Sequence, residues 1–208
     1  GSARYVVMAR SPLTGFLGES YAGGSMAHQL KRSGWDGLIV EGRSSEPVYL
    51  VITNKEVLLR DARHIWGKTT KEAIEALIGH HGHGFVMALI GPAGENGVRF
   101  ASIMQGLSRA AGRTGMGAVM GSKKLKAILV NGCEDPPVFQ KNRLIELIKH
   151  NARFLKECPS VEGWRRFGTG AAIDAFNELG NFPTQNFREG SFGDFERISG
   201  EEFMKVML

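Results

Sequence analysis

The chain has 208 residues, enough for one large domain or two small ones, and its 42% hydrophobic and 23% charged residues are ordinary for a globular protein. No apolar stretch approaches the roughly 20 residues that span a bilayer, so we expect no membrane partner. The net charge of +5 favours anionic ligands, but the chain lacks the interleaved basic and aromatic residues of nucleic-acid binders, so we expect no nucleic-acid partner.

The first 132 residues are rich in glycine and basic. They hold 21 of the 28 glycines and carry 16 Lys/Arg against 9 Asp/Glu, whereas the rest of the chain carries 10 against 12. Short apolar runs between turn residues predict strands, and amphipathic stretches predict helices. In chain order we expect a strand at 3–8, a helix at 24–32, a strand at 37–41, a hairpin of 48–52 and 56–60, a helix at 71–78 capped by Thr70, and strands at 85–90, 99–104 and 126–130.

The pattern changes after Gly132. Residues 134–137, Glu-Asp-Pro-Pro, read as a linker, and helical spacing of apolar residues follows at 143–156, 171–179 and 201–208. We therefore predict the α+β class, with a mixed-sheet, cofactor-binding N-terminal domain at 1–132 and the beginning of an all-helical domain at 133–208.

The most informative segment for function is residues 108–123, Ser-Arg-Ala-Ala-Gly-Arg-Thr-Gly-Met-Gly-Ala-Val-Met-Gly-Ser-Lys. Glycine lets a backbone approach a ligand closely, and arginine presents a planar fork of donors that matches phosphate oxygens. This combination favours a flat, phosphorylated ligand. A glycine-rich turn with solvated arginines is the structural alternative, because short motifs of this kind are weak evidence by themselves.

Cysteine and histidine give little support for a metal site. Cys133 and Cys158 are too far apart for a Cys-x-x-Cys unit and do not require a disulfide. His80, His81 and His83 lie close together, but no further ligand with suitable spacing is nearby, and we interpret them as part of a surface loop.

Further motifs follow one another in a fixed order. They are Ala-Arg-Tyr at 3–5, Ser-Pro-Leu-Thr-Gly at 11–15, Ala-Gly-Gly at 22–24, Leu-Lys-Arg-Ser-Gly-Trp-Asp at 30–36, Arg-Asp-Ala at 60–62, His-Ile-Trp-Gly at 64–67, Ile-Gly-Pro-Ala-Gly-Glu-Asn at 90–96 and, more weakly, 167–170 and 180–187. With residues 109–123, they resemble the N-terminal part of tungsten-containing aldehyde:ferredoxin oxidoreductases.

The resemblance implies a tungstopterin: tungsten, or sometimes molybdenum, held by two pyranopterins whose phosphates are bridged by Mg²⁺. Arg4 and Arg109 would reach the phosphates, and the backbone carbonyls of Tyr21 and Ala110 would serve the magnesium. Tyr21 stands where many members have asparagine, which a carbonyl role tolerates. The implied cofactor-binding residues are Arg4, Tyr21, Gly23, Arg109, Ala110 and Gly112.

The same resemblance implies a 4Fe-4S cluster, whose three closely spaced cysteines and distant fourth are not matched by Cys133 or Cys158. We expect those cysteines beyond Leu208 and the first strands of the domain before Gly1, so that the 208 residues alone would be inactive. We place no catalytic residue within this chain. The implied reaction of the full-length protein is oxidation of an aldehyde to a carboxylic acid with ferredoxin as electron acceptor, in the cytoplasm; the family often forms homodimers.

Two other functions stay open. The same architecture resembles the tungsten subunit of an anaerobic benzoyl-coenzyme A reductase, and these motifs scarcely separate the two reactions. A non-catalytic, glycine-rich module that binds nucleotides or other anions is the alternative outside enzymes; it predicts binding that weakens steeply with salt.

Overall fold

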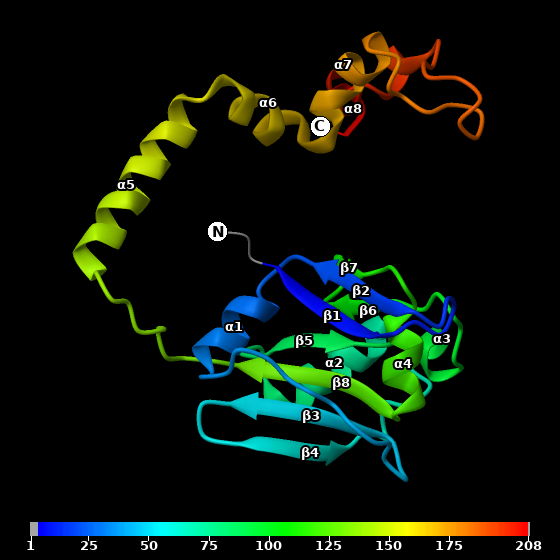
Figure 1. Cartoon of the computed structure of the whole chain (residues 1–208), viewed down its shortest axis with the longest axis vertical. Helices are drawn as coiled ribbons and strands as arrows, with labels where there is room; N and C mark the ends of the chain where they lie inside the picture. Colours follow the sequence, from blue (N-terminus) through cyan, green and yellow to red (C-terminus); the bar gives the residue numbers. More distant parts are fainter. Residues whose placement is uncertain (1–3, 208) are drawn as a thin grey trace. The chain divides into compact units, whose positions relative to one another are not determined.

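The computed structural model describes residues 4–207, so Ala3 and Leu208, at the ends of two predicted elements, lie outside the described part. The chain divides into two compact units, residues 1–137 and 138–208, which are considered separately (Figure 1). No helix within residues 4–207 is both long and apolar enough to cross a membrane.

A six-stranded sheet forms the centre of the first unit. Its strands follow the order β4 (Val57–Asp61), β3 (Val48–Thr53), β8 (Leu125–Asn131), β5 (Val86–Leu89), β6 (Ile103–Gln105) and β7 (Arg109–Ala111). β3 and β8 are parallel, and the other neighbouring strands are antiparallel. The predicted α+β class with a mixed sheet is therefore confirmed.

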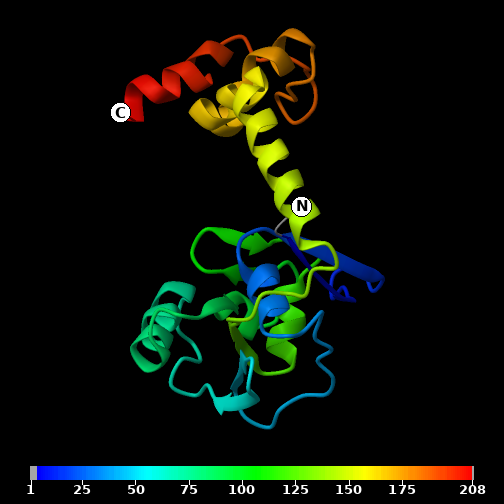
Figure 2. The same ribbon diagram turned by 90° about the vertical axis from the view of Figure 1, so that its left-hand side faces the viewer.

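Alternating side chains give this sheet two apolar faces. On β3, Tyr49 and Val51 belong to one buried cluster and Ile52 to the other. Helix α2 (Thr70–His81) packs on the first face. The second face is covered by α1 (Met26–Arg32), α4 (Met116–Ser122) and a ribbon of β1 (Tyr5–Arg10) and β2 (Leu17–Ala22). In Figure 2, α2 and the ribbon lie on opposite sides of the sheet.

The ribbon is antiparallel, with Tyr5 opposite Ala22 and Arg10 opposite Leu17. Along β2, Ser20 and Ala22 are buried while Tyr21 is exposed. The sequence predicted β1 but not β2, because Leu-Gly-Glu-Ser-Tyr-Ala contains few of the β-branched and aromatic residues typical of strands.

Helix α2 begins at a capping box. Thr69 Oγ1 accepts from the Glu72 backbone N–H at 3.3 Å, and the Glu72 carboxylate accepts from the Thr69 N–H at 2.8 Å, so the cap is Thr69 and the predicted cap Thr70 is wrong. The helix continues to His81 and ends before Gly82, whose φ is 78°. The predicted histidine loop is therefore wrong for His80 and His81, which form the last helical turn.

Two predicted strands differ from the structure. Residues 37–41 form no strand, although three apolar side chains occur in a row, because this segment pairs with no described strand. Ile39 is 92% exposed. The predicted strand at 99–104 shortens to β6, because its first residues form a turn in which the Ala101 N–H donates to the Val98 carbonyl.

The second unit is built from helices. They are α5 (Lys141–Glu157), α6 (Pro159–Phe167), η1 (Gly168–Ala172), α7 (Ile173–Glu178), η2 (Phe195–Ile198) and α8 (Gly200–Met207). Its strand pairing, in the part that the structure describes, is an isolated bridge between Thr184 and Glu189. The sequence missed α6, which begins with Pro159 at a position where a missing N–H costs no helical hydrogen bond.

Candidate functional site

Three segments that carry the predicted site residues meet in the first unit. Arg4 precedes β1 and Gly23 follows β2; because Tyr5 pairs with Ala22, both flank the same end of the ribbon. Arg109 begins β7, which is an edge strand of the sheet. The backbone N–H of Arg113 donates to Ser20 Oγ at 3.0 Å, so the chain after β7 lies against β2.

Gln105 joins two of these segments. Its side chain is buried, and its amide donates to the Gly23 carbonyl at 2.7 Å and accepts from the Ser25 N–H at 3.1 Å. Gln105 also pairs with Arg109 across β6 and β7. Gly24, next to Gly23, has φ 97°, and a Cβ there would come within 2.2 Å of the Gln105 amide. Glycine at 24 and glutamine at 105 together fix the backbone around Gly23.

The predicted site residues lie mostly on the surface. Arg4, Tyr21, Arg109, Ala110 and Gly112 are exposed, and Gly23 is half-buried. Among the described residues, no carboxylate lies within ion-pair distance of the Arg4 or Arg109 guanidinium. Two forked cations are therefore available at this end of the unit to bind an external anion.

The Tyr21 side chain makes its own contact on the ribbon. Its hydroxyl donates to the Glu19 carboxylate at 3.3 Å, and both side chains are on the outward face of β2. A backbone role for Tyr21 is compatible with this arrangement, since the side chain is engaged two residues away along the same strand.

The glycines of residues 108–123 serve mainly the protein's own packing. A Cβ on Gly115 would lie 2.0 Å from the Arg99 carbonyl oxygen. A Cβ on Gly117 would lie 2.5 Å from the Ser102 carbonyl oxygen, and one on Gly121 would lie 1.9 Å from the Gly94 carbonyl oxygen. At Gly112 the nearest atom would be 3.7 Å away. The interpretation of this segment as a glycine surface for a ligand is therefore wrong for three glycines and stays open for Gly112.

A buried ion pair joins Glu95 to Lys126 on β8. Lys126 and Glu95 are 0% and 5% exposed at their side chains and form a direct contact. Lys126 Nζ also donates to the Lys68 carbonyl at 2.9 Å, and the Gly67 N–H donates to Glu95 at 2.8 Å. Glu95 ends α3 (Pro92–Glu95), whose Gly94 lies against Gly121 of α4. This network joins α3 to β8 and to the loop at 67–68, and no pattern in the sequence pointed to it.

The histidines form a structural cluster on the other face of the sheet. The Tyr49 hydroxyl lies 2.9 Å from His81 Nε2, and the His64 ring packs edge-on to Tyr49. Burial lowers the pKa of His81. No group of three or more histidine, cysteine or acidic side chains that could hold a metal ion occurs among residues 4–207.

Two parts of the chain match domains of one known protein family. Residues 1–132 match the family described as "Aldehyde ferredoxin oxidoreductase, N-terminal domain", and residues 146–208 match "Aldehyde ferredoxin oxidoreductase, domains 2 & 3". Over 200 residues the chain is 44% identical to proteins of Pyrococcus abyssi and Pyrococcus horikoshii, both named tungsten-containing aldehyde ferredoxin oxidoreductase. The match covers 95% of this chain and 33% of each relative, so the chain spans about a third of their length.

A solved structure is also similar. It is the active-site complex BamBC of benzoyl-coenzyme A reductase in complex with 1,5-dienoyl-CoA. The similarity has a TM-score of 0.72 and 41% sequence identity, and it covers 75% of this chain and 24% of the other.

Proposed function

The chain belongs to the aldehyde ferredoxin oxidoreductase family, and from this and the site geometry we propose that it binds the phosphate end of a tungstopterin in a longer oxidoreductase. One observation supports this most strongly: Arg4 and Arg109, two exposed guanidinium groups without a carboxylate partner among the described residues, flank the backbone around Gly23 and Gly112. Forked donors of this kind match the oxygens of a phosphate-bearing ligand.

Arg4 and Arg109 would each hold a phosphate through paired N–H donors. Their placement at the end of the ribbon and on an edge strand gives them rigid supports, because β1 pairs with β2 and β7 pairs with β6. Gln105 would act indirectly, since its hydrogen bonds fix Gly23 and its strand partner is Arg109. Gly112 would let the backbone approach the pterin, because it is exposed and no atom crowds its α-carbon.

For Tyr21 and Ala110 we propose contacts through their backbone carbonyls to a phosphate-bridging Mg²⁺. Magnesium prefers hard oxygen ligands and keeps several waters, so two carbonyls and phosphate oxygens suffice from the protein's side. The residues fit the group: exposed cations, a glycine with free space and edge strands with available backbone gather at one place. When bound, the cofactor would supply redox chemistry that none of these side chains can perform.

The remaining parts of the enzyme belong to the same proposal. Residues 1–132 would form the cofactor-binding domain and residues 133–208 the beginning of the helical domain. Aldehyde oxidation, a 4Fe-4S cluster held by cysteines outside these residues, ferredoxin as acceptor and a cytoplasmic location would be properties of the longer protein, and a homodimer is compatible with them.

A second reaction has its own support. The similarity to the BamBC complex, at 41% identity, is compatible with a reductase acting on an aromatic coenzyme A thioester, as the alternative to aldehyde oxidation. Arg4 and Arg109 would keep the same role, since neither needs to touch the substrate. Assay of the full-length protein with aldehydes and with benzoyl-coenzyme A would separate the two reactions.

The arginine roles can be tested by Arg4→Ala and Arg109→Ala in the full-length protein. We expect both to lower the pterin content of the purified protein, and Arg109→Lys to restore it only in part, because lysine keeps the charge but not the fork. Arg60→Ala is the matched control: Arg60 is an exposed arginine on β4, at the opposite edge of the sheet from β7. Full pterin content in both alanine variants would contradict the proposal.

A further inference from the structure

The inner face of β2 is made of small residues. Gly18, Ser20 and Ala22 are buried and alternate with exposed residues along this strand, so all three belong to one face of the ribbon. Ala22 shares a buried cluster with Ala111 of β7. A Cβ on Gly18 would lie 2.8 Å from the Thr114 Cβ. The small residues of β2 therefore let β7 and the residues after it lie directly against this strand.

The Ser20 hydroxyl makes the hydrogen bond that joins these two parts of the chain. Ser20 is only 2% exposed, and its Oγ accepts from the Arg113 N–H at 3.0 Å. Both partners are next to residues of the proposed cofactor site, because Ser20 precedes Tyr21 and Arg113 follows Gly112. This hydrogen bond therefore helps to fix the distance between two backbone segments that carry the site.

The residue after Arg113 has a strained backbone. Thr114 has φ 64°, in the left-handed region that β-branched residues rarely adopt. Such a conformation persists only where the surrounding contacts determine it, and it is frequent near ligand sites. The Thr114 hydroxyl lies 2.6 Å from the Arg113 carbonyl oxygen and 3.4 Å from that of Glu19 on β2. Contacts with β2, and not local preference, therefore determine the course of this segment.

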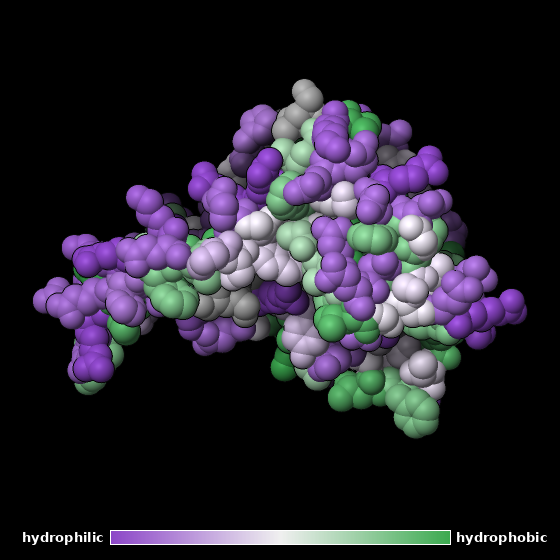
Figure 3. Space-filling view, turned by 90° about the horizontal axis from the view of Figure 1, so that it is seen from above, coloured by the Kyte–Doolittle hydropathy of each residue, from purple (hydrophilic) through white to green (hydrophobic). Residues whose placement is uncertain are grey.

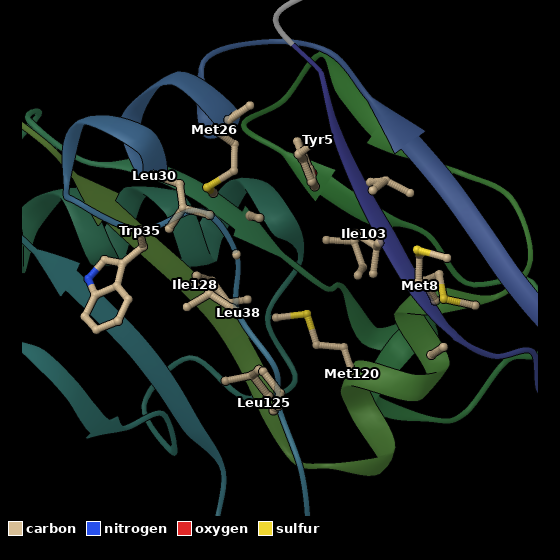
Figure 4. A pocket seen from close by; sticks show the side chains of 18 of the residues that line it. Tyr5, Met8, Met26, Leu30, Trp35, Leu38, Ile103, Met120, Leu125 and Ile128 are labelled. Atoms are coloured by element: carbon tan, nitrogen blue, oxygen red, sulfur yellow. The ribbon is translucent and has the colours of Figure 1, made fainter. Parts of the chain in front are cut away.

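The two strands of the ribbon differ in what lies beneath them. Residues 4–9, which include β1, border an apolar groove of about 560 Å³ that α1, α4 and β8 also line (Figure 4). No described residue of β2 lines this groove. The ribbon is thus open on its inner side at β1 and closely packed at β2, so the contacts of β2 fix its position relative to β7.

Two carbonyls that share one Mg²⁺ ion must be held at a fixed separation. Magnesium requires nearly ideal octahedral geometry with short bonds to oxygen. Tyr21 is on β2 and Ala110 is on β7, and within the described part of the chain no strand pairing joins β2 to β7. The spacing of their carbonyls therefore depends on other contacts between the two strands, and groups that orient metal ligands in this way change metal affinity.

We propose that Ser20 is a positioning residue of the cofactor site, an inference that rests on the proposed function. Its hydroxyl holds the Arg113 backbone against β2 and thereby sets the separation of the Tyr21 and Ala110 carbonyls for Mg²⁺. Ser20 acts through its neighbours and needs no contact with the ion or the phosphates, since its side chain is on the inner face of β2 and that of Tyr21 is on the outer face.

Magnesium affinity of the full-length protein tests this role. Ser20→Ala removes the acceptor of the Arg113 N–H, and we expect it to weaken Mg²⁺ binding about tenfold. Ser11→Ala is the matched control and should leave binding unchanged. Ser11 is also 2% exposed and its Oγ also accepts from backbone N–H groups, those of Leu13 and Thr14, at the other end of the ribbon. Elemental analysis after dialysis against EDTA-buffered magnesium measures both.

The outcomes separate this role from the proposed function. Equal magnesium affinity in Ser20→Ala and Ser11→Ala would overturn the role of Ser20. If Arg4→Ala and Arg109→Ala still lowered the pterin content, the phosphate contacts would stand and only the positioning by Ser20 would fail. An unmodified protein that contains pterin but no magnesium would overturn both the carbonyl contacts and the role of Ser20.

Hydrogen exchange of the unmodified full-length protein is a second test, and it needs no substitution. If the Ser20 hydrogen bond favours bound Mg²⁺, bound Mg²⁺ must favour the hydrogen bond to the same extent. We expect the Arg113 amide to exchange about tenfold more slowly with Mg²⁺ bound than after its removal by EDTA. The Leu13 and Thr14 amides, which are bonded to Ser11, should not change. An Arg113 amide that is equally insensitive to Mg²⁺ would contradict the proposal.

Discussion

The two units of the chain use their apolar residues differently. In the first unit, Ile52, Leu77 and Leu129 are fully buried on the two faces of the sheet. In the second, α5, α6 and α7 contain no buried residue. On the face of the molecule that Figure 3 draws, hydrophobic residues lie among hydrophilic ones. Amphipathic helices gain most of their stability from packing of the apolar face. The first unit is therefore stabilised by its own buried core, whereas the apolar faces of the helices in the second unit are exposed.

The largest expected change in stability comes from breaking the buried ion pair of the first unit. Lys126→Met leaves the Glu95 carboxylate buried without its cation, which we expect to cost about 3–5 kcal/mol of unfolding free energy. The double variant Lys126→Met, Glu95→Leu should recover much of this loss. Urea unfolding followed by circular dichroism measures both. Lys71→Met is the control, because Lys71 pairs with Glu75 on the exposed side of α2, and little change is expected.

If Lys126→Met changed stability no more than Lys71→Met, the pair would not hold α3 against β8, and the first unit's dependence on buried contacts would be in doubt.

The next prediction compares the stability lost when one leucine of each unit is replaced by alanine. Leu129→Ala, on β8, should cost about 2–5 kcal/mol, because it removes buried methyl groups and leaves a cavity. Leu147 on α5 is 51% exposed, so Leu147→Ala should cost much less in the 208-residue chain. Hydrogen exchange of β8 and of α5 in the two variants reports each unit separately. Equal losses would mean that α5 is buried in solution.

Replacing one glycine of each unit with alanine should change stability in opposite directions. Gly121→Ala places a Cβ 1.9 Å from the Gly94 carbonyl oxygen and should destabilise the first unit by about 1–3 kcal/mol. Gly163→Ala, in α6, meets only the Ala171 Cβ at 4.0 Å, and it should stabilise the helix by up to about 1 kcal/mol. Thermal unfolding of both variants checks the signs. A neutral Gly121→Ala would show that α3 and α4 are not in close backbone contact.

The smallest effect concerns pH. Burial, followed by the charges of His80, Arg60 and His64, lowers the pKa of His81 in the folded protein. Below the usual histidine pKa of about 6.5, the unfolded state then binds more protons than the folded state. Stability should be fully present above that pH and should fall as the pH decreases towards the folded pKa. His81→Gln should reduce this loss of stability at low pH, whereas His150→Gln on exposed α5 should not.

Much of the fold follows from local pattern. The hairpin of β3 and β4, the periodic face of α2 and the apolar run of β8 are recognisable because each is a continuous stretch with one period. The sequence did not predict β2 and wrongly predicted a strand at 37–41, because strand formation depends on a partner. β2 has one in β1 despite a weak strand sequence, and residues 37–41 have none among the described residues despite a strong one.

The site was predictable only in part. Family membership, predicted from collinear motifs, is confirmed, and the assignment of Arg4 and Arg109 to phosphates stays a prediction. Gln105 and Ser20 could not be found, because their contacts join residues that are 80 to 93 positions apart and no local motif marks them. The glycines at 115, 117 and 121 were misinterpreted for the same reason: close packing against another backbone and close approach to a ligand require the same residue.

The most direct measurement is elemental and pterin analysis of the full-length protein, purified without oxygen from cells that load tungsten enzymes. We expect tungsten, iron and magnesium together with pterin, detected by fluorescence after oxidation. A folded protein that contains neither metal nor pterin would contradict the central claim and leave an anion-binding module without a redox role.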